Sequence, residues 1–352
     1  MPKQIVIVTE EMDEHADAII LTLREMGHEP LRLHTADIPF ASTLSLNLDG
    51  GAWNGVIQLK NKVLDVSDIH SIWWRRPARP PIPEDLSKRE AEFVLEQFRH
   101  AMRGLWASLE CRWMSRPDKI YEASWKMEQL TRAVQFGFNI PPTLVTNDAT
   151  QVRAFYEEHR GHIIFKVLAD PMLGFGTIQE TAVQLNKESP EIKSSSEFLD
   201  QIRDLSRVVY TTVITNEHLL LIDNTLHRAP GIFQAYVPKR VELRIVVIGD
   251  DIFAGEIDSQ FHTRTQHDWR RFGVQVPIRK AVLPVDIAER CYAFTKSYGL
   301  TFSSMDFIQT PEDQYVFIEN NPNGQFLFVD VCVPEFKMRE AVANFLTQGM
   351  KT

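Results

Sequence analysis

The N-terminal residues switch between the two periodicities of regular secondary structure. Residues 4–8 (QIVIV) form an apolar run that predicts a buried strand. Residues 13–26 follow with apolar side chains at helical spacing, at Ala16, Ile19, Ile20, Leu23 and Met26. Gly27 ends this helix, and residues 30–34 (PLRLH) predict a second strand. The β-α-β order favours a small α/β domain, and a dinucleotide site has little support because the first turn lacks GxGxxG.

Apolar runs and turn residues continue this mixed pattern to about residue 116, where we place the first domain boundary. Residues 43–75 predict two or three strands that end in SIWWRRP. A proline-rich loop follows, and residues 87–108 predict a helix with apolar side chains available for a core.

Helices and strands alternate over residues 117–237. One helix is predicted over residues 118–139, ending at Gly137, and another at 149–159, where Asn147 and Asp148 are candidate caps. Strands are predicted at 143–146, 162–168 and 208–213. Residues 186–206 are polar and partly helical, which predicts an insertion or a mobile excursion. Residues 238–352 are rich in β-forming residues, with helices at about 286–298 and 335–347.

The composition of the 352 residues limits the class of protein. A content of 44% hydrophobic and 24% charged residues is typical of a globular chain of two or three modules. The net charge of -9 disfavours general nucleic-acid binding. Three cysteines without a CxxC pair argue against a disulfide framework or zinc cluster and favour the reducing cytosol. We expect no signal peptide and no membrane span, since no apolar stretch reaches about 18 residues.

The most informative stretch is residues 305–326 (MDFIQTPEDQYVFIENNPNGQF). Two β-rich runs flank a four-residue turn, PEDQ. If the hairpin is symmetric about this turn, Thr310 faces Tyr315, and Asp306 then lies directly opposite Glu319. Asn321 shares their face because it is two residues further on.

Carboxylates opposed in this way repel, so one of them is protonated or a divalent cation lies between them. Two carboxylates and an amide oxygen suit magnesium, which also takes water and phosphate oxygens. The alternative is that Asp306 and Glu319 are unrelated polar residues at a sheet edge, since a slip of one residue would separate them.

Lys166 lies within an apolar strand, where a lysine is costly to bury unless an anion meets it. A nucleotide phosphate would serve, and Gly174 and Gly176 in the next loop would let backbone amides approach it. Alternatively, Lys166 reaches solvent from an edge strand. Glu242 and Arg244 share one face of a later strand, where they form a surface ion pair or contact a ribose hydroxyl and a phosphate.

The order of these elements resembles the ATP-grasp superfamily. Along the chain, these elements are a strand lysine with a glycine loop, a hinge strand, a Glu-x-Arg strand, and a late Asp followed by Glu-x-Asn-Pro. The resemblance implies an α/β (α+β) ATP-grasp fold. Its parts are an N-terminal α/β pre-ATP-grasp domain (1–116), a central small subdomain (117–237) and a C-terminal β-rich subdomain (238–352).

The resemblance also implies ATP and Mg²⁺ as cofactors and a role for each matching residue. Phosphates are held by Lys126 and Lys166, beside the glycine loop of Gly174 and Gly176. Adenine binds the hinge formed by Gln234, Ala235, Tyr236 and Val237. Ribose binds Glu242, the γ-phosphate binds Arg244, and Mg²⁺ binds Asp306, Glu319 and Asn321.

Longer segments resemble the maturases of microviridin-type peptides, the graspetide synthetases, over nearly the whole chain. They are WWRRP, LTRAVQFGFNIPPTLVTN, VELRIVVIGDDIFAGEIDSQ, HDWR, MDFI and FIENNPNGQF. Those enzymes close ω-ester or ω-amide rings in a ribosomally made precursor peptide. The resemblance therefore implies a precursor peptide, with a leader helix and an acidic core, as the partner of a cytoplasmic ligase. Arg75, Arg76 and Arg270 are candidates for holding its carboxylates, and Arg244 for the transferring phosphoryl group.

Several alternatives remain open for these residues. The WWRR run could instead pack its aromatic rings with cation–π support, and only one of Arg75 and Arg76 faces the site on a strand. Asp268 and Arg270 could form an ion pair that braces a loop. His267 and Asp258 are candidates for a general base.

The sequence also departs from the relatives in places, and other functions fit part of the pattern. Asn320 and Gln325 stand where relatives more often carry an aliphatic residue and Glu, and the 180–206 segment is longer. A small-molecule ligase of the glutathione synthetase or glutamate ligase kind, or a non-enzymatic ATP-binding protein, would also carry the ATP site. A homodimer is possible through the C-terminal helix and the proline-rich loop.

Overall fold

The computed structural model describes residues 3–38, 41–78, 85–169, 172–173, 207–208, 211–270 and 274–350. The glycine loop with Gly174 and Gly176, and the predicted insertion at 186–206, lie outside the described residues.

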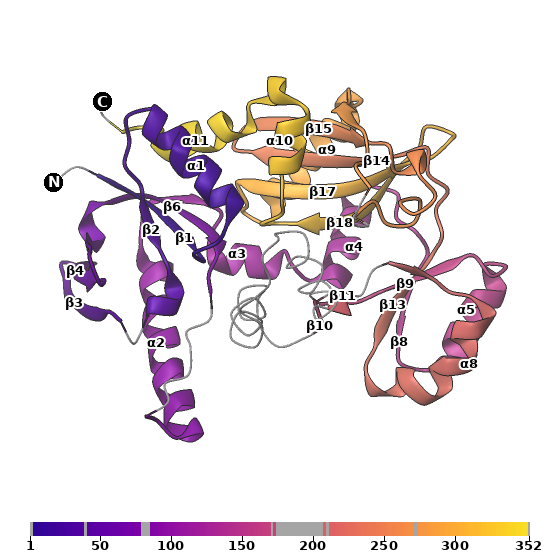
Figure 1. Cartoon of the computed structure of the whole chain (residues 1–352), viewed down its shortest axis with the longest axis horizontal. Helices are drawn as coiled ribbons and strands as arrows, with labels where there is room; N and C mark the ends of the chain where they lie inside the picture. Colours follow the sequence, from indigo (N-terminus) through magenta and orange to yellow (C-terminus); the bar gives the residue numbers. More distant parts are fainter. Residues whose placement is uncertain are drawn as a thin grey trace, which may run out of the picture.

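A parallel sheet in the order β2-β1-β6-β7 forms the N-terminal part of the chain (Figure 1). Its strands are β1 (Gln4–Thr9), β2 (Leu31–Leu33), β6 (Ile69–Arg76) and β7 (Arg112–Met114). The predicted β-α-β start is confirmed, with α1 (Glu14–Glu25) between β1 and β2. The helix predicted at 87–108 is α2 (Lys88–Ser108), which begins with a capping box of Ser87 and Glu90.

Residues 43–75 hold more strands than predicted. Besides β6, they form the antiparallel sheet of β3 (Thr43–Asp49), β4 (Ala52–Gln58) and β5 (Val63–Asp65). The three-residue β5 was too short to show a periodicity of its own.

The central sheet has the order β12-β9-β13-β8. Its strands are β8 (Thr143–Thr146), β9 (Ile163–Lys166), β12 (Thr212–Val213) and β13 (Gly231–Ala235). Two helices, α5 (Ala149–Glu158) and α8 (Asn216–Thr225), accompany it (Figure 1). The Asp148 side chain caps α5, as expected, and α8 was not predicted. The short strands β10 (Met172–Leu173) and β11 (Arg207–Val208) pair separately.

The prediction of one continuous helix over residues 118–139 is wrong, because the segment forms two helices, α3 (Pro117–Glu122) and α4 (Lys126–Gln135). The break is stabilised by Gln129, whose amide donates to the carbonyl oxygen of Ala123 at 2.7 Å. A buried side chain thus satisfies a backbone group at the point where the helix ends.

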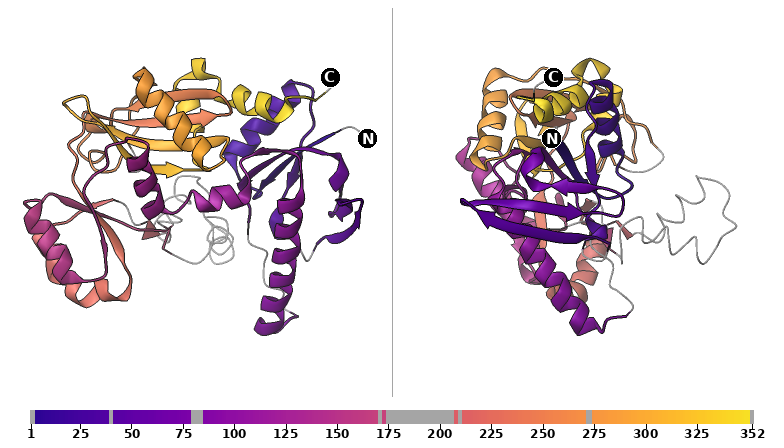
Figure 2. Two further views of the ribbon diagram at one scale, coloured as in Figure 1. Left: turned by 180° about the vertical axis from the view of Figure 1, so that it is seen from behind. Right: turned by 90° about the vertical axis from the view of Figure 1, so that its left-hand side faces the viewer.

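The C-terminal sheet is antiparallel, in the order β16-β15-β14-β17-β18. Its strands are β14 (Val241–Ile248), β15 (Asp251–Ile257), β16 (Ile278–Lys280), β17 (Phe302–Gln309) and β18 (Tyr315–Asn321). Helix α9 (Val285–Ser297) covers one face (Figure 2). The unpredicted α10 (Leu327–Cys332) follows β18, and α11 (Met338–Thr347) begins later than predicted, after a 3₁₀ turn at Pro334–Phe336.

The hairpin of β17 and β18 differs from its predicted register at the turn. Tyr315 pairs with Gln309 and not with Thr310. The reason is a shorter loop that closes where the Thr310 N–H donates to the Gln314 carbonyl at 2.9 Å, with Asp313 in the left-handed region at φ 62°. A β-bulge at Ile318 then shifts the register back, so that Asp306 does lie opposite Glu319.

The apolar cores cross the predicted domain boundaries. Helix α11 packs beside α1 and the N-terminal sheet, where Leu346 joins a core with Ile7 and Leu23 (Figure 1). Leu130 of α4 joins the C-terminal core around Phe294. The boundaries after residues 116 and 237 stay predictions. Among the described residues, no helix combines the length and apolar character needed to cross a bilayer.

We predict that Leu346→Ala lowers the free energy of unfolding by about 2–5 kcal/mol, because it leaves a cavity in the core beneath α11. Chemical denaturation measures the change. Leu220→Ala removes the same side chain from an exposed position, and equal losses in the two variants would contradict the packing of α11.

Candidate active site

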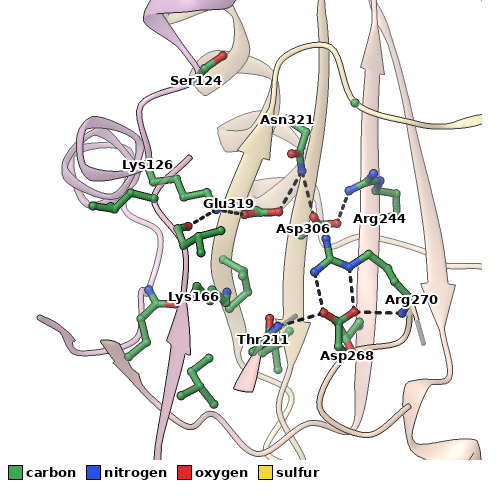
Figure 3. A pocket seen from close by; sticks show the side chains of 18 of the residues that line it. Ser124, Lys126, Lys166, Thr211, Arg244, Asp268, Arg270, Asp306, Glu319 and Asn321 are labelled. Carbon is green, nitrogen blue, oxygen red and sulfur yellow. Dashed lines mark hydrogen bonds and ion pairs between the residues drawn. The ribbon is translucent and has the colours of Figure 1, made fainter. Parts of the chain in front are cut away.

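A cavity of about 970 Å³ lies between the central and C-terminal sheets. Side chains from both sheets, from α4 and from two loops point into it (Figure 3). It brings together most residues singled out from the sequence, namely Arg76, Lys126, Lys166, Gln234, Ala235, Tyr236, Val237, Glu242, Arg244, Arg270, Asp306, Glu319 and Asn321. Arg75 is not among its lining residues.

Asp306 and Glu319 face each other from neighbouring strands at the centre of the cavity (Figure 3). Asn321 joins them, because its Nδ2 donates to Asp306 Oδ2 at 3.1 Å and to Glu319 Oε1 at 3.4 Å. A half-turn of this amide would present its oxygen to the same point. The sequence prediction that these three side chains share one face is therefore confirmed.

The two carboxylates differ in how readily they ionise. Burial raises the pKa of Asp306, and the nearby Glu319 raises it further against the opposing effect of Arg244. Burial would also raise the pKa of Glu319, but Lys126 and Lys166 outweigh it and lower that pKa below its usual range. A raised pKa means that the ionised form of one carboxylate is disfavoured, and a bound cation would stabilise that form. These residues therefore fit a divalent metal ion.

Cationic side chains surround the carboxylate pair. Arg244 Nη1 lies 2.6 Å from Asp306 Oδ1, and its Nε and Nη2 donate to the carbonyl oxygen of Gln325 at 3.2 and 3.0 Å. Lys126, the first residue of α4, places Nζ 3.5 Å from Glu319 Oε2 and donates to the Val167 carbonyl at 2.9 Å. Lys166 also lines the cavity, so these three cations outnumber the two carboxylates and leave charge available for an anion.

Lys166 shows this excess of positive charge most directly. Burial lowers its pKa, and Lys126 and Lys239 lower it further against the opposing effect of Glu319. The edge-strand alternative is wrong, because β9 lies inside its sheet between β12 and β13. A buried ammonium group among other cations fits a phosphate ligand.

The link between β13 and β14 forms another wall of the cavity. Gln234 is buried and donates from Nε2 to Thr143 Oγ1 at 3.0 Å, and the chain then leaves the sheet after Ala235. Tyr236 lies edge-on to His267, with ring centroids 5.7 Å apart. The predicted hinge is thus a strand end followed by an irregular link, and its residues line the cavity.

Glu242 and Arg244 share a face of β14, but each has its own partner. Glu242 Oε1 lies 2.8 Å from Lys239 Nζ, which also donates to the carbonyl of His267. Arg244 binds Asp306. No sequence pattern indicated the place of Lys239 in the cavity, because its contact with His267 is not local.

Asp268 and Arg270 form the bracing ion pair that the sequence left as an alternative (Figure 3). Arg270 donates to both carboxylate oxygens of Asp268, at 2.8 and 2.7 Å. Burial would raise the pKa of Asp268, but Arg270 lowers it. The Arg270 side chain remains 49% exposed and lines the cavity, so the pair also presents a guanidinium to a ligand.

The two arginines of the WWRR run point in different directions, as expected on a strand. Arg76 lines the cavity and lies 3.9 Å from Glu10. Arg75 is buried outside the lining of the cavity, with its guanidinium 5.9 Å from the ring of Trp73. Of the two candidate bases, His267 lines the cavity, and Asp258 lies outside the lining, 3.5 Å from Arg279.

Comparisons with known proteins show what the chain is similar to. A family model described as the MvdD pre-ATP grasp domain matches residues 4–121. No curated protein sequence matches the chain significantly.

Solved structures match over almost the whole chain. The macrocyclase MdnC from Microcystis aeruginosa MRC, bound with precursor peptide MdnA, is 26% identical, with a TM-score of 0.78 and coverage of 98% of this chain and 100% of that one. A Chryseobacterium gregarium RiPP-associated ATP-grasp ligase in complex with ADP, a leader and a core peptide is 27% identical, with a TM-score of 0.81 and coverage of 98% and 96%. Macrocyclase MdnB from Microcystis aeruginosa MRC is 25% identical, with a TM-score of 0.74 and coverage of 99% and 100%. The expected ATP-grasp fold is confirmed.

We predict a strong energetic coupling between Arg244 and Asp306. A double-mutant cycle with Arg244→Met and Asp306→Asn should give about 1–3 kcal/mol, since both side chains are largely buried. Chemical denaturation of the four proteins measures it. The exposed pair of Arg24 and Glu29, 2.7 Å apart, is the control, and an equally large coupling there would contradict the assigned environment.

Proposed function

We propose that this chain, which is similar to macrocyclases of ribosomal peptides, is an ATP-grasp ligase that crosslinks the side chains of a precursor peptide at the expense of ATP. The observation that carries the proposal is the convergence of Asp306, Glu319, Lys126, Lys166 and Arg244 on one cavity. Similarity over nearly the whole chain to enzymes bound to precursor peptides supports a peptide as the substrate.

The residues present fit magnesium and a nucleotide. Asp306, Glu319 and Asn321 would hold the metal ion, which when bound offsets phosphate charge and polarises the phosphorus–oxygen bonds. The excess positive charge at Lys126 and Lys166 would hold phosphates. The link with Gln234, Ala235, Tyr236 and Val237 would take adenine and Glu242 the ribose. Gly174 and Gly176, expected beside the phosphates, lie outside the described residues.

The proposed reaction has two displacements. An Asp or Glu side chain of the peptide takes the terminal phosphoryl group of ATP, which leaves ADP and an acyl phosphate. A Ser or Thr hydroxyl, or a Lys amine, of the same peptide then attacks the acyl carbon and releases phosphate, giving an ω-ester or an ω-amide. Most of the rate enhancement would come from positioning and charge stabilisation.

The contacts of Arg244 suit it to the transferring phosphoryl group. Its guanidinium is held on two sides, by the Gln325 carbonyl and by Asp306, so it needs no reorganisation to meet developing negative charge. Arg76 and Arg270 line the same cavity with exposed guanidinium groups and would hold carboxylates of the peptide. His267 is the better placed candidate for accepting the proton of the nucleophile.

The direct test incubates the protein with ATP, magnesium and the acidic precursor peptide encoded beside it. Each ring closed should lower the mass of the peptide by one water, and only when ATP is present. An unchanged peptide, together with ADP release that depends on a free amino acid, would contradict the proposal and indicate a small-molecule ligase.

Two further expectations stay proposals. A homodimer is one, to be tested by sedimentation. A reducing cytosolic location is the other, and the free thiols of Cys111, Cys291 and Cys332 support it.

We predict that Asp306→Asn and Glu319→Gln each lower the rate of ring closure by about 10²-fold or more, because each removes a charge from the metal site. Peptide mass spectrometry over time measures the rate. Glu312→Gln makes the same chemical change on the exposed turn of the same hairpin and should leave the rate within about twofold. A similar loss in all three variants would contradict the assignment.

We predict that Lys166→Met weakens ADP affinity at least about tenfold, a change of about 1.4 kcal/mol, because a buried phosphate partner is lost. Calorimetric titration with ADP and magnesium measures the dissociation constant. Lys60→Met, at an exposed position, is the control. Unchanged affinity in the Lys166 variant would remove this lysine from the nucleotide site.

A further inference from the structure

Arg75 carries a buried charge at the junction between the N-terminal sheet and the loop after β18. It is 2% exposed, and its Nη1 donates to the Asn323 carbonyl oxygen at 2.5 Å. The Asn323 side chain donates back to the Arg75 carbonyl. Within the described part of the chain, Arg75 Nε and Nη2 make no hydrogen bond, although Nε lies 3.5 Å from Asp13 Oδ2. A buried guanidinium with incomplete hydrogen bonding lowers the stability of the fold, so packing alone does not explain why Arg75 stands at this position.

His15 forms hydrogen bonds with the other end of the same loop. Its Nε2 accepts the backbone N–H groups of Phe326 and Leu327, at 3.1 and 3.2 Å, and its ring lies edge-on to Phe326. A ring nitrogen that accepts these bonds requires the neutral imidazole. Burial, aided by the charge of Arg75, lowers the pKa of His15 to about 3 and keeps it neutral at ordinary pH.

Asp13 joins these two contacts. It caps α1 by accepting the His15 backbone N–H at 3.1 Å, and it accepts the hydroxyl of Thr9 at 2.7 Å. Its carboxylate is also the nearest anion to Arg75. One buried carboxylate at the start of α1 thus lies close to both side chains that reach the loop, 3.8 Å from His15 Nδ1 and 3.5 Å from Arg75 Nε.

Gln325 lies between Asn323, which binds Arg75, and Phe326, which binds His15. Its carbonyl oxygen accepts both Nε and Nη2 of Arg244, at 3.2 and 3.0 Å. Arg244 in turn binds Asp306 at the carboxylate pair. A shift of the loop would therefore move the guanidinium that faces the cavity.

We propose that Asp13, His15 and Arg75 are positioning residues, which hold the Gln325 carbonyl from the N-terminal domain and thereby fix Arg244. The catalytic consequence rests on the proposed function. The contacts join residues 248 to 312 positions apart, so the N-terminal domain would take part in setting the geometry of the ATP site.

The test compares two variants that differ in one acceptor. His15→Leu removes the acceptor for Phe326 and Leu327, and His15→Gln retains an oxygen at a similar reach. We expect His15→Leu to speed hydrogen exchange of these two amides at least about tenfold. We expect it to lower kcat for ring closure at least about tenfold, with the KM for the peptide within about threefold. His15→Gln should remain within about threefold of the wild type in both measurements.

Leu346→Ala separates positioning from stability, because it weakens the same core and removes no hydrogen bond of the loop. If it lowers kcat as much as His15→Leu does, the role of His15 is structural and the proposal is overturned. The proposal is also overturned if His15→Leu speeds hydrogen exchange of the Phe326 and Leu327 amides without lowering kcat. It is overturned as well if these amides exchange at the wild-type rate in His15→Leu.

If the wild-type protein closes no ring, the proposed function fails, and the affinity for ADP with magnesium becomes the measure of positioning. His15→Leu should then weaken this affinity by about threefold or more and His15→Gln should not. Equal affinities in the two variants would overturn the inference separately from the proposed function.

Discussion

The structure depends most on two carboxylates that face each other across a hairpin. Asp306 and Glu319 repel in a largely buried position, and each is tolerated only because cations lie against it. Arg244 contacts the first, and Lys126 lies near the second. The strands, the start of α4 and the neighbouring loops hold these carboxylates and cations around one cavity, which fits a metal ion and an anion.

Distant parts of the chain cooperate to hold that arrangement. The bulge at Ile318 brings Glu319 opposite Asp306, and the central sheet supplies Lys166 from an interior strand. The N-terminal sheet and α1 reach the loop after β18 through buried polar contacts, and α11 returns to pack beside α1. The ATP-grasp parts therefore form one connected scaffold around the cavity.

Some of this was predictable from sequence, because side chains alternate along strands and buried charges need partners. The predicted pairing of Asp306 with Glu319 is confirmed, but the symmetric turn from which it was predicted is wrong. The left-handed Asp313 shortens the loop and the bulge restores the register, so the two differences cancel. The short helices α8 and α10 gave no clear periodicity. The contact between His15 and Phe326 joins residues 311 positions apart, and no local pattern marks it.

The central claim is that the carboxylate pair forms a metal site that works with a nucleotide. Manganese binding in the presence of ADP, followed by electron paramagnetic resonance, tests it most directly, since Mn²⁺ takes the same oxygen ligands as Mg²⁺. The account predicts saturable, nucleotide-dependent binding to the wild-type protein that is lost in the double variant Asp306→Asn/Glu319→Gln. Equally tight binding to the double variant would place the metal ion elsewhere and contradict the account.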